Sequence, residues 1–362
     1  MDNDSIKDKL LADRRLKPYT KDDLLSTSST LLNLALTGHA EGGFVKGKYF
    51  FFVGDSSSGK TFLALSILAE ATINPNFDKY RLIHDDIEGG ALMDIHRYFG
   101  AEVAKRLEPP KGTIEKPVYS EDVEDFYCNV DDAFQEEKPF IYILDSQDAL
   151  HSKYAEKKFQ ELKVSIQKGT QSRGDYGDGK AKTHSTRLRK VCAKLRDTKS
   201  ILVIINQTRD NLDIGLFTPK STYSGGRALT FYSCAQIWSS TKTRIKKTIK
   251  GKERQIGIIS KVSIKKNRLT GKEWSVEVPI YFSYGVDDVG SCIDYLIGEK
   301  HWETKKSGIV VAKEFDGMVG RKDEIAKEIE NSDLQDELKG IVQDVWKNVE
   351  AACAVDRRPR YN

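Results

Sequence analysis

Residues 54–61 read Gly54-Asp55-Ser56-Ser57-Ser58-Gly59-Lys60-Thr61 and match the Walker A pattern G-x-x-x-x-G-K-T. In this pattern the glycines let successive backbone N–H groups face a phosphate. We expect Lys60 to neutralise phosphate oxygens and the hydroxyl of Thr61 to reach Mg²⁺. An apolar run at 49–53 precedes the motif and a helix-forming segment at 62–71 follows it. This context predicts a strand, a phosphate-binding loop and a helix whose N-terminus points at the phosphates.

Length and composition indicate a globular protein of about two domains. The chain has 362 residues, of which 39% are hydrophobic, and a net charge of +4. No run approaches the roughly 20 apolar residues that cross a bilayer, and the first residues are charged. We therefore expect a cytoplasmic protein, in the host cytoplasm if a virus encodes it. The five cysteines form no C-x-x-C pair or Cys/His cluster, so neither disulfides nor a zinc site is predicted.

The charges are distributed unevenly along the chain. Residues 241–272 contain twelve Lys or Arg and one acid, Glu253, whereas residues 121–137 contain eight acids and no base. A basic run of this kind fits a polyanionic partner on one face of the molecule, or simply a solvated surface.

Further apolar runs predict the fold class. Three of them suit buried strands and are separated by helix-sized segments: residues 80–86, 140–145 and 201–206. This alternation is typical of an α/β fold in which helices flank a mostly parallel, twisted sheet and ligands bind at the carboxyl ends of the strands. Residues 241–278 alternate polar and apolar side chains around turns at 250–251 and 270–272, which predicts antiparallel strands at the sheet edge.

We divide the chain into three parts. Residues 1–30 are predicted to form a small, charged, helical arm, and residues 31–300 the core that contains the sheet. Residues 301–362 are predicted to form a small, mostly helical region, with helices at 323–329 and 334–349.

Carboxylates at two strand ends are candidates for nucleotide chemistry. Asp145 closes the apolar run 140–145 in the manner of a Walker B motif and would hold the hydration shell of Mg²⁺, although such an Asp can also cap the next helix. Asp85, Asp86 and Glu88 follow another strand and could orient a water molecule for attack on the γ-phosphate. We favour Glu88 for this role and a structural role for Asp86.

An amide and two loops extend the candidate site. Asn206 and Gln207 end a strand, where an amide could hydrogen-bond the γ-phosphate. Residues 168–182 and 210–227 are rich in Gly and lack apolar periodicity, so both are predicted to be loops. Their cations and rings would suit a channel for a single-stranded nucleic acid, or they are surface loops without this function: Lys168, Arg173, Lys180, Lys182, Lys220, Arg227, Tyr176, Phe217 and Tyr223.

Taken in order, these motifs resemble the RecA family of recombinases, including those carried by bacteriophages. The resemblance spans about residues 24–300. It rests on the following segments: 24–36 (LLSTSSTLLNLAL), 54–61, 86–88 (DIE), 144–146 (LDS), 205–209 (INQTR), 224–233 (SGGRALTFYS) and 265–268 (KKNR). It departs from the family pattern at four positions: Ser28 for glycine, Asn33 for aspartate, Arg268 for lysine, and Ile95 where an aromatic ring often covers adenine, leaving His96 or Tyr98 as substitutes.

The resemblance implies a RecA-like P-loop ATPase that uses ATP and Mg²⁺. It implies that Lys60 and Thr61 contact phosphate and metal, that Asp145 binds the metal, and that Glu88 activates water. Gln207 would couple the γ-phosphate to the second DNA loop. Lys266 and Arg268 would act as cations on the ATP of a neighbouring subunit.

The resemblance also implies a DNA-binding role for several residues in and around the two loops: Arg173, Lys180, Lys182, Arg209, Lys220, Tyr223, Gly225, Gly226 and Arg227. The protein is expected to be a DNA-dependent ATPase that polymerises on single-stranded DNA and exchanges strands with a homologous duplex in recombination and repair. Residues 1–30 would pack on the adjacent copy in a helical filament. A ring-forming helicase or motor of the same fold, or a non-catalytic ATP-binding relative, are the alternatives.

Overall fold

The computed structural model of the chain describes residues 19–90, 93–168, 179–210, 221–305 and 308–358. Most of the predicted N-terminal arm lies outside these residues. Four predicted members of the two loops also lie outside them: Arg173, Tyr176, Phe217 and Lys220.

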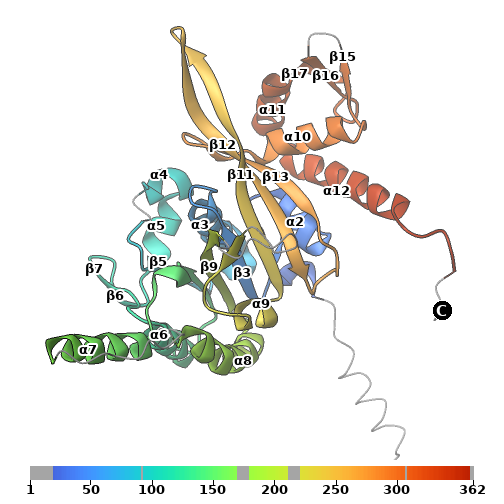
Figure 1. Cartoon of the computed structure of the whole chain (residues 1–362). Coiled ribbons are helices and arrows are strands. Elements are labelled where there is room, and N and C mark those ends of the chain that lie inside the picture. The colour runs from blue at the N-terminus through green and yellow to red at the C-terminus, as the bar shows by residue number, and fades with distance from the viewer. Residues whose placement is uncertain (1–18, 91–92, 169–178, 211–220, 306–307, 359–362) are drawn as a thin grey trace, which may run out of the picture.

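A single large sheet forms the centre of the molecule (Figure 1). Its parallel strands confirm the predicted α/β fold, and all four predicted core strands are present. In spatial order they are β11 (Ala235–Ile249), β3 (Tyr49–Gly54), β9 (Ile201–Asp210), β8 (Phe140–Asp145), β4 (Arg81–Asp86) and β5 (Leu107–Glu108). The short β10 (Ser221–Tyr223) pairs antiparallel with β9.

Antiparallel strands extend the sheet beyond β11, as predicted. They are β12 (Lys252–Asn267), β13 (Ser275–Tyr281) and β14 (Gly285–Val286). The turn between β11 and β12 lies at Lys250 and Gly251, whose φ angles are 51° and 71°. The ends of β11 and β12 project from the body as a long ribbon that carries much of the basic run (Figure 1). β11 begins earlier than predicted, because its first residues pair with β3 inside the sheet.

Both faces of the sheet are buried, which explains the continuous apolar runs of its strands. On β3, Phe50 and Phe52 belong to one core cluster, whereas Tyr49, Phe51 and Val53 belong to the other. The first cluster includes residues of α2 (Thr30–Thr37) and α3 (Lys60–Ile73), and the second includes residues of α6 (Val123–Gln135) and α8 (Lys180–Thr198).

Shorter elements complete the connections between the strands of the core. They are β1 (Leu24–Leu25), β2 (Phe44–Val45), α4 (Ile95–Phe99), α5 (Ala101–Arg106), β6 (Lys111–Thr113), β7 (Lys116–Val118), α7 (Lys153–Gln167) and α9 (Ala228–Tyr232), with 3-10 turns at Lys21–Asp23, Pro75–Phe77 and Gln147–Ala149. β1 and β2 pair with each other, and Leu24 and Leu25 are buried, so this end of the predicted arm packs on the core.

The structure corrects both predicted loops at their described ends. α8 begins at Lys180 after Gly179, whose φ of 79° sets the start of the helix. Lys180 and Lys182 therefore lie in a helix. The sequence did not reveal where this helix begins, because the preceding glycines favour a loop. In the second loop, residues 221–223 pair with 208–210 as a hairpin.

The C-terminal region contains helices and a small sheet. The small sheet has three short antiparallel strands, β15 (Glu303–Lys305), β16 (Ile309–Ala312) and β17 (Met318–Arg321). In the chain, α10 (Asp288–Gly298) precedes these strands, and α11 (Lys322–Asn331) and α12 (Gln335–Ala352) follow them. The sequence predicted the last two helices but missed this sheet, since strands of three or four residues carry little periodicity. Within the described ranges, no helix combines the length and the hydropathy that a membrane span requires.

Replacing Phe51 by Ala tests the sheet core. Phe51 lies on the central strand β3 with no exposed surface, so a cavity should reduce the free energy of unfolding by about 3–5 kcal/mol. Ile73→Ala is the matched control, because 75% of the Ile73 side chain is exposed at the end of α3 and its loss should change stability by less than about 0.5 kcal/mol. Urea unfolding measures both, and equal effects would contradict the assigned core.

Candidate nucleotide and nucleic-acid site

The phosphate loop is a rigid turn fastened to the neighbouring strands. It joins β3 to α3, and Gly59 begins the helix with a left-handed φ of 87°. The hydroxyl of Ser58 lies 2.8 Å from the hydroxyl of Ser239 on β11, and Ser260 on β12 donates to the Ser58 carbonyl at 2.8 Å. A Cβ on Gly54 would lie 2.2 Å from the Ser239 hydroxyl, so only glycine fits there. These contacts hold the loop in place between β3 and α3.

Lys60 is held inside this loop. Its ammonium donates to the Asp55 carbonyl at 2.6 Å, and only 8% of the residue is exposed. Burial lowers the pKa of Lys60, while the carboxylates of Asp145, Asp55 and Glu88 oppose that shift. A buried ammonium favours an anionic partner, so the position fits a phosphate.

The side chains of Thr61 and Asp145, the two predicted metal ligands, contact each other. The Thr61 hydroxyl donates to an Asp145 carboxylate oxygen at 2.6 Å, and His84 Nε2 lies 4.0 Å from the same oxygen. One hydroxyl and one carboxylate are the hard oxygen ligands that Mg²⁺ takes from a protein when phosphates and water supply the rest. These two residues thus fit Mg²⁺ bound together with a nucleotide.

A pocket of about 780 Å³ opens beside the loop. It is lined by the phosphate loop and by four apolar side chains, Met93, Ile258, Ile280 and Phe282. Such side chains suit a flat base. Arg244 and Gln255, from the β11–β12 ribbon, also line it.

The three residues that the sequence suggested for covering adenine do not line this pocket. Ile95 lines a different cavity, against β5, and Tyr98 lines a third cavity, with its hydroxyl donating to the Phe282 carbonyl. His96 is exposed on α4 and does not line the pocket. Met93 and Phe282 do line it, and no motif in the sequence marked them.

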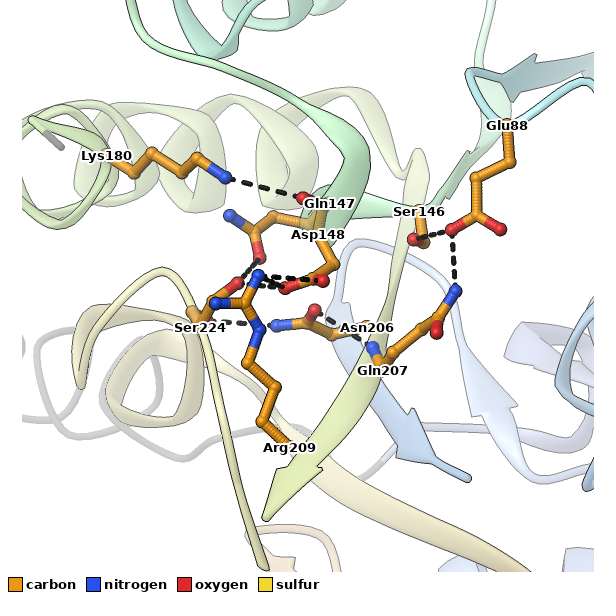
Figure 2. Close-up of polar contacts among 9 residues, drawn as sticks. All are labelled: Glu88, Ser146, Gln147, Asp148, Lys180, Asn206, Gln207, Arg209 and Ser224. Atoms are coloured by element: carbon orange, nitrogen blue, oxygen red, sulfur yellow. Dashed lines mark hydrogen bonds and ion pairs between the residues drawn. The ribbon is translucent and has the colours of Figure 1, made fainter. Parts of the chain in front are cut away.

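The three candidate carboxylates are in different environments. Asp85 is buried and accepts hydrogen bonds from the Ser120 N–H, the Ser120 hydroxyl and the Tyr142 hydroxyl, and burial raises its pKa. Asp86 accepts from the Gly90 N–H at 3.1 Å. Glu88 accepts from the Ser146 hydroxyl and, at 2.8 Å, from the Gln207 amide (Figure 2). Of these three carboxylates, Glu88 is the one that contacts Gln207, the residue predicted to couple the γ-phosphate to the second loop.

The end of β9 connects the phosphate loop to the second predicted loop. Thr208 donates to the Asp55 carboxylate at 2.6 Å, next to Gln207. Asn206 donates to the Ser224 carbonyl at 2.9 Å, in the segment that closes the second loop. Three consecutive residues of β9 thus contact Glu88, the phosphate loop and the segment that closes the second loop.

The described residues predicted to bind DNA fall into two groups. Arg209 and Lys180 both contact Asp148 (Figure 2), and Gly225 lies beside Gln147. Gly225 and Gly226 have φ angles of 90° and 82°, which only glycine adopts easily. Lys182 and Arg227 are exposed outside this group.

Tyr223 does not offer a free ring for stacking. Its ring packs 5.0 Å from Phe51 and 6.2 Å from Trp238, and its hydroxyl bonds with that of Thr230. Tyr223 therefore anchors this segment to the core, and its predicted DNA-binding role stays a prediction.

Lys266 and Arg268 cap the end of α9. Lys266 donates to the carbonyls of Thr230, Phe231 and Ser233, and Arg268 donates to that of Phe231 at 2.8 Å. Burial, together with Arg268, lowers the pKa of Lys266 to about 8. Neither residue is among the described residues that line the nucleotide pocket.

Comparison with known proteins agrees with this geometry. A family model of the RecA N-terminal domain matches residues 141–287. Protein RecA of Rhodopirellula baltica is 30% identical over 322 residues, which cover 88% of this chain and 76% of that protein. Protein RecA of Bacteroides thetaiotaomicron is 27% identical over 326 residues, covering 88% and 87%, and that of Helicobacter pylori is 28% identical over 330 residues, covering 89% and 83%.

The fold and the phosphate loop place the chain in the P-loop class of proteins, with a RecA-like α/β core. Within that class, the chain belongs to the RecA family.

Replacing Lys60 by Met tests the phosphate site. Methionine keeps much of the volume but removes the charge, and a charged hydrogen bond contributes about 1.5–3 kcal/mol, so the Kd for Mg-ATP should rise about 10- to 100-fold. Lys116→Met, on the exposed hairpin strand β7, is the control and should leave the Kd unchanged. Calorimetric titration of both variants measures the effect, and equal affinities would place the nucleotide elsewhere.

Proposed function

We propose that the chain is an ATP-dependent DNA recombinase that forms filaments on single-stranded DNA and promotes pairing and strand exchange with a homologous duplex. The observation that carries the proposal is the contact between Glu88 and Gln207, at 2.8 Å. It joins the residue predicted to act on the γ-phosphate to the strand that leads into the second predicted DNA loop. RecA-family membership supports the same reading.

The geometry supports specific tasks for the residues around the pocket. The N–H groups of the phosphate loop and Lys60 would bind the phosphates of ATP, and Thr61 with Asp145 would hold Mg²⁺. The metal would supply charge stabilisation at the β- and γ-oxygens. Glu88 would orient a water molecule and accept its proton as the water attacks. Ser146 donates to Glu88 and would fix the orientation of this carboxylate.

Coupling between ATP and DNA follows from the same contacts. The Gln207 amide donates to Glu88. A γ-phosphate would offer this amide a second acceptor and change the position of Gln207. Because Asn206 and Thr208 bind Ser224 and the phosphate loop, this change would bias the arrangement of the DNA-facing segment.

An assay of strand exchange tests the proposal. Purified protein, ATP, Mg²⁺, circular single-stranded DNA and a homologous linear duplex should yield joint molecules, and electron microscopy should show open helical filaments. Closed rings that unwind a forked duplex would instead favour a motor of the same fold. Protein that binds ATP without DNA-stimulated hydrolysis would favour a non-catalytic relative.

The Glu88→Gln variant should lose ATP turnover by about two or more orders of magnitude while it keeps ATP and DNA binding. An amide of the same shape cannot accept the proton of the attacking water. Steady-state hydrolysis with DNA measures turnover, and Glu102→Gln on the exposed surface of α5 is the control. Unchanged turnover would mean that Glu88 is structural, and would move the assignment to Asp85 or Asp86.

Replacing Lys266 and Arg268 together by Ala should abolish DNA-stimulated hydrolysis and leave nucleotide binding to the monomer nearly unchanged. The reason is that cations supplied to a neighbouring active site can contribute roughly 10³ in rate. Mixing this double variant with Lys60→Ala protein should restore part of the activity, since some mixed interfaces then contain one intact site. Absence of rescue would indicate that both residues only hold α9, as they do within one chain.

A further inference from the structure

The three residues that follow β8 are Ser146, Gln147 and Asp148, and they contact two parts of the site (Figure 2). Ser146 donates to Glu88, on the side of the phosphate loop. Gln147 accepts from the Ser224 hydroxyl at 3.3 Å, and Asp148 accepts from that hydroxyl and from Arg209. Nothing in the motifs of the sequence assigns a role to Asp148.

Asp148 lies among predicted DNA-binding groups. The Arg209 guanidinium lies 2.9 Å from its carboxylate oxygens, and the Lys180 ammonium donates to its backbone carbonyl at 3.4 Å. The Asp148 side chain is 21% exposed, whereas that of Arg209 is 56% exposed. Burial alone would raise the pKa of Asp148, but hydrogen bonds from Arg209 and Ser224 hold it below its usual value. The carboxylate is therefore ionised at neutral pH.

We propose that Asp148 is an internal counter-ion that occupies Arg209 in the DNA-free chain, and that a backbone phosphate of single-stranded DNA takes its place. This inference rests on the proposed function and concerns the regulation of the same DNA site. A guanidinium binds the oxygens of a phosphate as it binds those of a carboxylate, so the two anions compete for one group. The half-exposed Arg209 can be reached from solvent without unfolding the surrounding segment.

Through this competition Asp148 acts as a positioning residue that lowers the affinity of the chain for single-stranded DNA. Before DNA binds, it holds Arg209 against the turn after β8 and holds Ser224 beside it. When a phosphate takes Arg209, Asp148 retains Ser224, so the change is confined to the end of β9. Gln207 lies two residues before Arg209 on that strand and binds Glu88, which places the exchange next to the nucleotide sensor.

The Asp148→Asn variant tests this inference. It should bind a fluorescein-labelled oligothymidine two- to fivefold more tightly than the natural chain at low salt, since a partly exposed ion pair contributes in this range. Asp132→Asn is the control for net charge, because Asp132 is an exposed acid on α6 that pairs only distantly with Lys111, at 3.8 Å. It should change the affinity less. The Kd for Mg-ATP without DNA should be the same in all three proteins.

A second comparison separates competition from a general charge effect. In an Arg209→Ala background, Asp148→Asn should no longer raise DNA affinity, because the group that both anions share is gone. Asp148→Ser offers the same test with a smaller side chain if the Asn variant unfolds at a lower temperature.

Three results would overturn the inference. Equal gains for Asp148→Asn and Asp132→Asn would reduce the effect to net charge. Weaker DNA binding by Asp148→Asn would mean that Asp148 orients Arg209 toward DNA. A gain that persists without Arg209 would assign the effect to another group. If the natural chain binds ATP but no single-stranded DNA, the proposed function fails together with the inference.

Discussion

The register of three parallel strands positions the whole candidate site. β4, β8 and β9 run side by side, with Asp86 opposite Asp145 and Leu144 opposite Ile204. Their carboxyl ends therefore meet at one edge, which brings Glu88, Ser146 and Gln207 into hydrogen-bonding contact. A shift of one residue in any of these strands would turn the side chains to the opposite face and separate the groups. The apolar faces of the sheet, buried on both sides, hold this register.

The same sheet connects the nucleotide pocket to surfaces that another copy could reach. β12 contributes Ile258 to the pocket wall and carries Lys266 near its end, against α9. The serines of β11 and β12 also bind the phosphate loop. One strand thus touches both the chain's own phosphate site and the cations assigned to a neighbouring site. In a filament, this arrangement would link successive nucleotide sites through rigid strands instead of loops.

The sequence predicted the parts of the molecule that rest on local patterns. The phosphate loop follows from its glycines, the core strands from their apolar runs, and α12 from its helical periodicity. It did not reveal contacts that depend on distant strands, such as the position of Met93 and Phe282 in the pocket. The sequence did not mark Asp148, because its partner Arg209 is 61 residues away and the two come into contact only when the sheet forms. The packing of Tyr223 against Phe51 and Trp238 was likewise hidden in the sequence, because these rings come from distant strands.

The central claim is that the contact of Gln207 with Glu88 couples the phosphate site to the DNA-facing end of β9. The most direct measurement is the affinity for a labelled oligothymidine with and without a non-hydrolysable ATP analogue, together with the affinity for the analogue with and without DNA. The account predicts that each ligand tightens binding of the other by the same factor, on the order of 5- to 150-fold, because such coupling is reciprocal. It also predicts that Gln207→Ala brings this factor close to one. Independent binding of the two ligands by the natural chain, or full coupling without the Gln207 amide, would contradict it.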